Sequence, residues 1–328
     1  MSFFKGCLRG ALLSALLVLC GCQKSPDVSI TFGGDMFLAR DGNALFTQVD
    51  PWSQVSKAIQ RQQSGAQQTF FFANLESPVY EATQTGQTSK PTGYDLCADS
   101  SQLKLLKQGG VSLVNLANNH EMDCGSGSTD ATRQTVLQNG INVVGPDLIP
   151  TFLDTTAGKI GILAAEDVTQ PLNIDGLISA IQTVRKQCDV LIVSLHWGNE
   201  YQTGESQRQQ QLAQKLADAG VDVLWGTHPH VLQSIKWVSS SDGKHQMLAM
   251  YSLGNLLTDQ WMTSDTQQSV LVTLQFQAKK MVKISILPIQ MDRSSLQLTL
   301  PNTDVVKMIE DRLGVNEIST AIISLSAP

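Results

Sequence analysis

The sequence is poor in cysteine. Beyond Cys22 only Cys97, Cys124 and Cys188 remain, an odd number that leaves at least one of them unpaired unless it pairs with another molecule. Their spacing leaves a Cys97–Cys124 pair open. A disulfide framework is therefore excluded, and stability must come from a hydrophobic core, which a hydrophobic fraction of 42% permits.

The sequence also lacks an excess of basic residues. Its 23 Lys and Arg against 29 Asp and Glu give a formal net charge of −6, which argues against a nucleic-acid backbone as partner. The length of 328 residues has room for one large α/β domain or two smaller ones. The sequence contains no internal repeat or long linker, and we predict a single domain over residues 28–328.

The N-terminal apolar run is short. Met1–Arg9 carries positive charge, and the apolar core Gly10–Leu19 is too short to span a bilayer as a mature anchor, which is typical of a secretory signal. The run ends in Leu-Cys-Gly-Cys at residues 19–22, which resembles the bacterial lipobox, whereas an Ala-x-Ala cleavage site is absent.

We therefore predict a lipoprotein signal peptide over residues 1–21 and a lipidated tether over residues 22–27. Acyl chains on Cys22 would anchor the protein to a membrane, and two or more chains would make this anchoring stable. The predicted location is the bacterial cell envelope. In a Gram-negative cell, Gln23 in place of an aspartate favours the outer membrane.

Strand-like apolar runs alternate with helical patterns over most of the chain. Strands are expected at Val28–Phe32, at Thr69–Ala73, from Val111, and at Ile141–Val144, Lys159–Ala164, Val190–Leu195 and Val221–Trp225. This alternation predicts parallel pairing with right-handed crossovers. Ser128 or Thr129 is expected to cap the helix that ends near Gly140, and the polar stretch Glu81–Lys90 is expected to be a surface loop.

The pattern changes after residue 233, where strands follow one another with tight connections. They are expected at Ser234–Val238, Gln246–Tyr251, Ser269–Phe276, Met281–Leu287 and Leu296–Leu300. These strands favour a second, antiparallel sheet packed on the first, which gives an α/β sandwich.

Residues of the types that bind metals follow nearly every strand-like run in the first three quarters of the chain. They are Asp35, Asn74, Glu76, Asn119, His120, Glu121, His196, His228 and His230. Open α/β sheets place their ligands at the carboxyl ends of parallel strands. A divalent metal would satisfy several of these side chains at once, whereas each buried histidine would otherwise need its own partner.

The mixture of imidazole, carboxylate and amide oxygen suits Mn, Fe or Zn and does not resemble a thiolate-rich structural zinc site. We predict one or two divalent ions. Two ions about 3.5–4 Å apart could share a carboxylate, activate water and clamp a phosphoryl group.

The triplet Asn119, His120 and Glu121 predicts a catalytic function. The asparagine offers an oxygen to metal, the histidine can protonate a leaving group, and Glu121 can orient that imidazole through its other ring nitrogen. Glu121 could equally be an acid at a helix N-terminus, where the helix dipole favours it.

Several longer motifs carry a family resemblance. They are, in order, GGDMFLAR, FANLESPV, LANNHEMDCG, the helix into INVVGP, VSLHWGNEY, LADAGVDVLWGTHPHVLQ and YSLGN. Together these motifs resemble the bacterial capsule-synthesis family called CapA or PgsA, which is associated with poly-γ-glutamate and belongs to the calcineurin-like metallophosphoesterase fold. The resemblance implies an α/β fold in which two mixed sheets form a sandwich flanked by helices.

The resemblance also implies a role for each matching residue. Asp35 would bind a first metal, Asn74 or Glu76 would occupy the bridging region, Asn119 and His196 would bind a second metal, His120 would be the catalytic histidine, and His228 and His230 would form the closing His-x-His pair.

This sequence departs from the general metallophosphoesterase pattern at two ligand positions. The usual Asp-x-His is Asp35-Met36-Phe37, and the usual Gly-Asp is Ala73-Asn74 with Glu76 nearby. A single ion, or a second ion bound only with substrate, is therefore the alternative to a tightly held pair.

The resemblance implies a membrane-anchored, metal-dependent phosphoester hydrolase that is linked to capsule or poly-γ-glutamate synthesis or export. Its substrate would be anionic or phosphorylated, and proteins of capsule-polymer synthesis or export would be its partners. The alternative is a non-catalytic polymer-binding or assembly factor on a degenerate metallophosphoesterase fold, and the missing histidine at Phe37 is its main support.

Overall fold

The structure is a computed structural model that describes residues 25–39, 49–80 and 96–315. The predicted signal peptide, the lipidation site Cys22 and the predicted loop Glu81–Lys90 lie outside these residues. Within the part that is described, no helix is long and apolar enough to cross a membrane.

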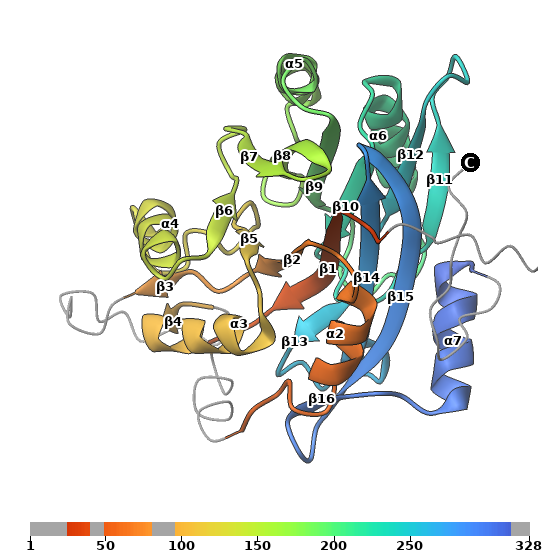
Figure 1. The fold of residues 1–328 in the computed structure, drawn as a ribbon. Coiled ribbons are helices and arrows are strands. Elements are labelled where there is room, and N and C mark those ends of the chain that lie inside the picture. Colours follow the sequence, from red (N-terminus) through yellow and green to blue (C-terminus); the bar gives the residue numbers. More distant parts are fainter. Residues whose placement is uncertain (1–24, 40–48, 81–95, 316–328) are drawn as a thin grey trace, which may run out of the picture.

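The first sheet has eight strands and combines both ends of the described chain (Figure 1). Its order is β16-β15-β14-β1-β2-β5-β6, with β13 also paired to β1. The strands are β1 (Val28–Met36), β2 (Gln68–Leu75), β5 (Leu113–Asn115), β6 (Asn142–Val144), β13 (Asn255–Leu257), β14 (Gln268–Gln277), β15 (Lys280–Asp292) and β16 (Gln297–Thr299). Strands β1, β2, β5 and β6 are parallel, whereas β14 to β16 run antiparallel.

The second sheet has six strands in the order β11-β12-β10-β9-β8-β7. They are β7 (Thr151–Thr155), β8 (Gly158–Glu166), β9 (Val190–His196), β10 (Val223–Thr227), β11 (Ile235–Ser239) and β12 (Gln246–Met250). Its four inner strands are parallel, and β7 and β11 pair antiparallel at its edges. A small additional pair joins β3 (Val79–Tyr80) to β4 (Ala98–Asp99).

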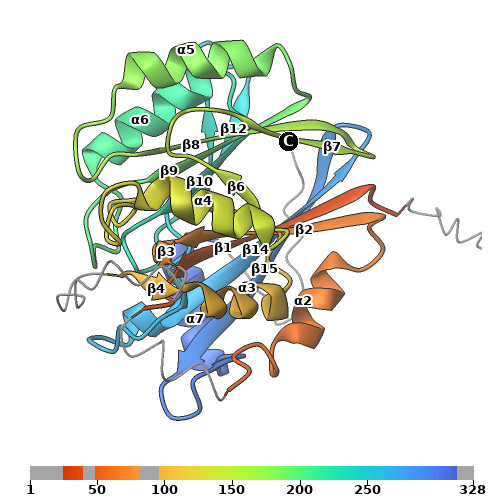
Figure 2. The ribbon, with the colours of Figure 1, turned by 90° about the vertical axis from the view of Figure 1, so that its left-hand side faces the viewer.

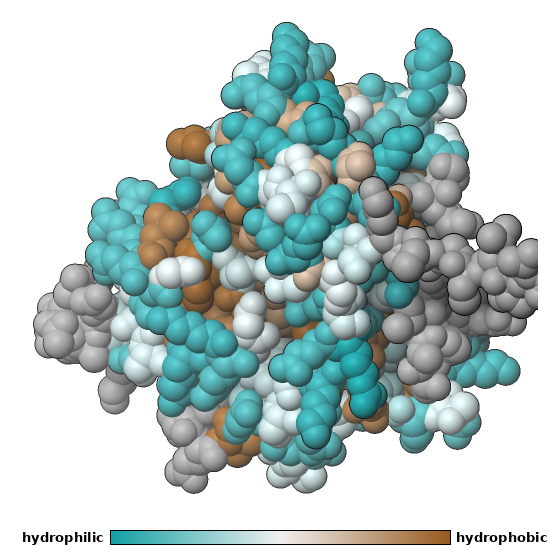
Figure 3. Space-filling model, in the orientation of Figure 1, coloured by the Kyte–Doolittle hydropathy of each residue, from teal (hydrophilic) through white to brown (hydrophobic). Residues whose placement is uncertain are grey.

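Helices flank the two sheets on their outer faces, except for the last helix, whose apolar side chains join the core between the sheets (Figure 2). They are α2 (Ser56–Gln63), α3 (Leu103–Gly109), α4 (Ser128–Gln138), α5 (Ile174–Arg185), α6 (Gln207–Asp218) and α7 (Thr303–Leu313). Helices α5 and α6 share an apolar cluster with the second sheet, and α2 and α3 share one with the first. Figure 3 shows that hydrophilic residues cover much of one face of the molecule.

The main core lies between the two sheets. Phe32 and Phe72 from the first sheet contact Trp225 from the second, with ring centroids 5.7 and 6.3 Å from that of Trp225. All three side chains are fully buried. Burying a large apolar side chain contributes about 1.5–3 kcal/mol to the free energy of folding. The Trp225 indole also donates to the Gly33 carbonyl at 3.0 Å, so a polar contact fixes one sheet on the other.

The structure confirms the predicted α/β sandwich with two mixed sheets flanked by helices. The expectation that the later strands form an antiparallel sheet of their own is wrong. Strands β14 to β16 extend the first sheet through β1, and β11 and β12 extend the second through β10. The reason is burial, because nine of the ten residues of β14 are buried. Such a strand needs a paired strand along each edge and packed side chains on both faces.

Candidate metal centre

The candidate metal centre lies where the carboxyl ends of strands from both sheets meet. Asp35 is the last residue but one of β1, Asn74 is the last residue but one of β2, Glu76 follows β2 directly, and His196 ends β9. Strand β1 passes so close to β13 that a Cβ on Gly34 would lie 1.7 Å from the Gly254 carbonyl oxygen. Only glycine fits there, and this close approach fixes the position of Asp35.

The predicted ligands that follow these strands are deeply buried. Asp35, Asn74, Glu76 and His196 are each 0% exposed, and His228, after β10, is 4% exposed. Asp35, Glu76 and His196 each offer a ligand atom, and these atoms all lie within 4.8 Å of one another. Buried carboxylates beside imidazoles require compensation of their charge, which a divalent cation supplies.

Asn74 and Glu76 differ in what they offer. The Asn74 amide donates to Asp35 Oδ1 at 2.7 Å and to Glu76 Oε1 at 3.3 Å. Its own carbonyl oxygen accepts from Asn115 Nδ2 at 3.0 Å. Glu76 Oε1 lies 3.8 Å from His196 Nε2 and 3.9 Å from His230 Nδ1. Between the two alternatives of the sequence, this geometry favours Glu76 as the carboxylate at the centre and Asn74 as the residue that orients it.

His228 and His230 face the same centre from the turn after β10. The His228 backbone N–H donates to Asp35 Oδ2 at 3.1 Å, and His230 Nδ1 lies 3.2 Å from the same oxygen. Both residues have positive φ values, 96° and 59°, a backbone conformation that non-glycine residues rarely adopt. Among the described residues, the buried Nδ1 of His228 has no hydrogen-bond partner.

Three further side chains hold the imidazoles in place. Thr227 Oγ1 lies 2.9 Å from His196 Nδ1, and Asn119 Oδ1 lies 2.7 Å from His196 Nε2. Asn255 Oδ1 lies 3.1 Å from His230 Nδ1. Asn255 is the last residue of the YSLGN motif, for which composition predicts only a strand and a turn.

Burial controls the charge of the histidines. It is the main cause that holds the pKa of His196 well below its usual value, and the neighbouring His228 and His230 lower it further. Burial, with His230 adding to it, lowers the pKa of His228 to about 4. Both imidazoles are therefore neutral near pH 7, which is the form that binds metal. The carboxylates of Asp35 and Glu76 and the neutral imidazoles therefore form a set of donors that fits a divalent ion.

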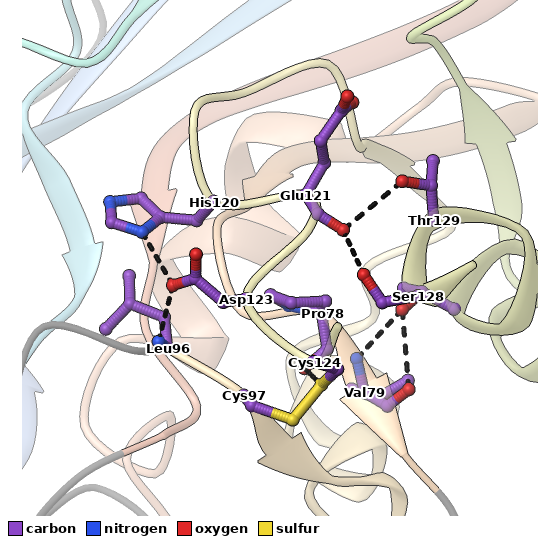
Figure 4. The surroundings of a disulfide bond; sticks show 11 residues. Pro78, Val79, Leu96, Cys97, His120, Glu121, Asp123, Cys124, Ser128 and Thr129 are labelled. Carbon is purple, nitrogen blue, oxygen red and sulfur yellow. Dashed lines mark hydrogen bonds and ion pairs between the residues drawn. A yellow bond between two sulfur atoms is a disulfide. The ribbon is translucent and has the colours of Figure 1, made fainter. Parts of the chain in front are cut away.

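The structure places Asp123, and not Glu121, against the predicted catalytic histidine (Figure 4). Asp123 Oδ2 lies 2.8 Å from His120 Nδ1 and also accepts the Leu96 backbone N–H at 2.7 Å. On its other side, His120 Nε2 lies 4.0 Å from Glu76 Oε2. Asp123 was not among the predicted site residues, because its only signal in the sequence is a carboxylate three residues after the histidine.

Glu121 has a different environment from the one expected. Its side chain points away from His120 in Figure 4, and burial is the main cause that raises its pKa. It lies seven residues before α4 begins, outside the first turn of that helix. The hydroxyls of Ser128 and Thr129 donate to its carbonyl oxygen at 2.5 and 3.2 Å. They are thereby not available to cap α4, whose N-cap is Gly127 without a side-chain bond.

A disulfide links Cys97 to Cys124 beside this histidine. Cys97 follows Leu96, and Cys124 follows Asp123, so the bond joins the two segments that meet at the Asp123 carboxylate (Figure 4). The structure therefore forms the pairing that the spacing left open, and Cys188 remains a free cysteine.

A cavity of about 320 Å³ opens beside the centre. Its lining includes His120, His230, Glu200, Phe37, Tyr201 and Trp261. His120, with 20% of its side chain exposed, thus stands between the buried ligands and a space that can admit a substrate.

The two-sheet sandwich has a fold of the metallophosphoesterase type. The structure is similar to that of a phosphatase from Mycoplasma pneumoniae, with a TM-score of 0.51 and 15% identity over 83% of this chain and 97% of the other. At this identity the similarity shows the fold alone.

The family model described as "Bacterial capsule synthesis protein PGA_cap" matches residues 29–260, and the chain belongs to this family. Two relatives are similar in sequence. The capsule biosynthesis protein CapA of Bacillus anthracis is 29% identical over 247 residues, which cover 68% of this chain and 58% of the relative. The PGA biosynthesis protein CapA of Bacillus subtilis (strain 168) is 28% identical over 302 residues, which cover 83% of this chain and 74% of the relative.

Proposed function

We propose that this protein is a metal-dependent phosphoester hydrolase that acts in the synthesis or export of a capsule polymer. The observation that carries the proposal is the buried set Asp35, Glu76 and His196, whose ligand atoms lie within 4.8 Å of one another near a cavity that His120 lines. When bound, a divalent ion would neutralise a phosphoryl group and activate the attacking water.

His120 supplies the proton that a leaving oxygen requires. Its Nδ1 faces Asp123, which fixes the ring orientation and stabilises the protonated imidazole, and its Nε2 faces the side of the ligand cluster. Asp123 is in turn held by the Leu96 N–H. Asn119 and Thr227 fix the ring of His196, so the ligands need little rearrangement when an ion binds.

The biological setting is proposed from the family and the N-terminal sequence. The two relatives carry the names capsule and PGA biosynthesis protein, and a lipid on Cys22 would anchor this chain in the cell envelope. Its partners would then be the proteins that synthesise or export the polymer, and its substrate an anionic or phosphorylated group.

A non-catalytic assembly or polymer-binding role is the second candidate. One observation favours it: Phe37 occupies the position where the metallophosphoesterase pattern has a histidine ligand, and its ring lies 5.3 Å from the His230 ring. An apolar side chain there removes one ligand from the expected set.

Turnover of phosphoesters by single-residue variants tests the first candidate against the second. We expect His120→Ala and His196→Ala to lose most activity. His245→Ala is the matched control, because His245 contacts the Val221 carbonyl away from the centre. Unchanged turnover in both site variants would refute the hydrolase. A deletion strain that loses its polymer coat while the purified protein turns over no phosphoester would favour the assembly role.

A further inference from the structure

We infer that Glu200 completes a second metal-binding site with His228 and His230. This inference rests on the proposed metal-dependent function and assigns a ligand that the metallophosphoesterase motifs do not include. One carboxylate oxygen of Glu200 and one ring nitrogen of each histidine all lie within 4.8 Å of one another. The group is separate in its members from Asp35, Glu76 and His196, so the centre holds two ligand sets side by side.

The backbone around Glu200 is fixed on the turn that carries both histidines. The Tyr201 backbone N–H donates to the Pro229 carbonyl at 2.8 Å, and Pro229 lies between the two histidines. Gln233 Nε2 donates to the Gln202 carbonyl at 2.8 Å. Gln209 in turn donates to the buried Gln233 at 2.9 Å. The carboxylate is therefore attached to a loop that two hydrogen bonds join to the segment around His228 and His230.

Each of the two histidines has a ring nitrogen that can bind a metal ion beside Glu200. His230 Nδ1 lies 3.1 Å from Asn255 Oδ1 and 3.2 Å from Asp35 Oδ2. This leaves Nε2 to bind a metal, as is usual for histidine ligands whose other ring nitrogen is hydrogen-bonded to the protein. His228 is 4% exposed, and its Nδ1 has no hydrogen-bond partner among the described residues. A buried imidazole nitrogen without a partner is costly unless an ion satisfies it.

Glu200 would add a carboxylate ligand to a centre that lacks the histidine of the usual motif at Phe37. The Phe37 and Tyr201 rings lie 5.3 and 6.1 Å from the His230 ring, so the imidazole lies next to the residue that follows Glu200. Two imidazoles and a carboxylate form a set that Mn, Fe and Zn accept, with positions left open for water and substrate. Glu200 is exposed and lines the cavity, so this ion would exchange more readily than one held by the buried set.

Metal stoichiometry and affinity test the inference without recourse to activity. The purified protein is titrated with Mn²⁺ by calorimetry, and its metal content is measured after dialysis against excess Mn²⁺. We expect the wild type to bind two ions with different affinities, and Glu200→Gln to lose the weaker one. That affinity should fall at least about tenfold, because even outer-shell partners of metal ligands cost 10–100-fold when mutated.

The matched control is Asp259→Asn, which removes a carboxylate from the lining of the same cavity but not from the ligand set. It should keep both ions. Two ions bound by Glu200→Gln with wild-type affinities would overturn the inference, and so would a wild type that binds only one ion. A wild type that binds no ion at all would instead overturn the proposed function, which separates the two failures.

Discussion

The substitution Asp123→Asn tests how the proposed general acid is oriented. The new side chain has the same shape, so its amide oxygen can still accept the Leu96 N–H that Asp123 Oδ2 accepts at 2.7 Å. What it loses is the negative charge that lies 2.8 Å from His120 Nδ1. The imidazole is then less stable in its protonated form and less firmly held in the orientation that presents Nε2.

The size of the effect follows from the exposure of the pair. A hydrogen bond to a charged group contributes about 1.5–3 kcal/mol. The side chains of His120 and Asp123 are 20% and 18% exposed, so solvent screens part of the interaction and the lower half of that range applies. A loss of about 1.5–2 kcal/mol corresponds to a fall in kcat of about 10- to 30-fold.

The assay compares two leaving groups. A general acid matters most when the leaving oxygen is basic, so we expect the full loss with an alkyl phosphoester and a smaller loss with the matched 4-nitrophenyl ester. Metal content should stay at the wild-type value, because Asp123 is in neither ligand set. In a His120→Ala background, Asp123→Asn should cost little more, since both changes remove one interaction. Equal losses with both esters, or a full additional loss in the double variant, would refute this role.

Two further predictions concern stability. Replacing Cys97 and Cys124 by serine opens a link between residues 27 apart, which should lower the unfolding free energy in urea by about 3–4 kcal/mol in the chain-entropy model; an unchanged midpoint, or an equal drop in a Cys188→Ser control, would contradict this. The pKa of His228 is about 4 when folded and 6.5 ordinarily, so below pH 6.5 the unfolded chain binds a proton that the folded chain does not. With chelator present, stability should therefore fall by up to about 3 kcal/mol between pH 6.5 and 4, and His228→Asn should flatten this slope; the same slope in both proteins would contradict it.

The sequence was sufficient to predict which residues meet, because strand ends follow a general rule. Asp35, Asn74 and His196 each close an apolar run, and parallel strands present their carboxyl ends at one edge. The structure brings these residues together from both sheets. The fold class was implied by the family resemblance that the motifs carry.

The division of strands between the sheets could not be predicted. An apolar run identifies a strand but not the strand that it pairs with. Strand β14 pairs with β1, although 231 residues lie between Met36 at the end of β1 and Gln268 at the start of β14. Only the packing of the whole chain decides this pairing. For the same reason a run of strands near the C-terminus looked like a sheet of its own.

The direction of side chains in turns could not be predicted from the sequence either. In the turn after Asn119, the Asp123 N–H donates to the His120 carbonyl at 2.9 Å, which brings the carboxylate three residues on back to the histidine and leaves Glu121 pointing away (Figure 4). Glu200 likewise lies in the loop after His196, where no period indicates which way a side chain points.

Elemental mass spectrometry of the purified protein tests whether the buried cluster holds metal. The double variant Glu76→Gln/His196→Ala is the comparison, because it removes two ligands of the buried set Asp35, Glu76 and His196. We expect stoichiometric Mn, Fe or Zn in the wild type and its loss in the double variant. A wild type without metal that takes up none on titration would contradict the account.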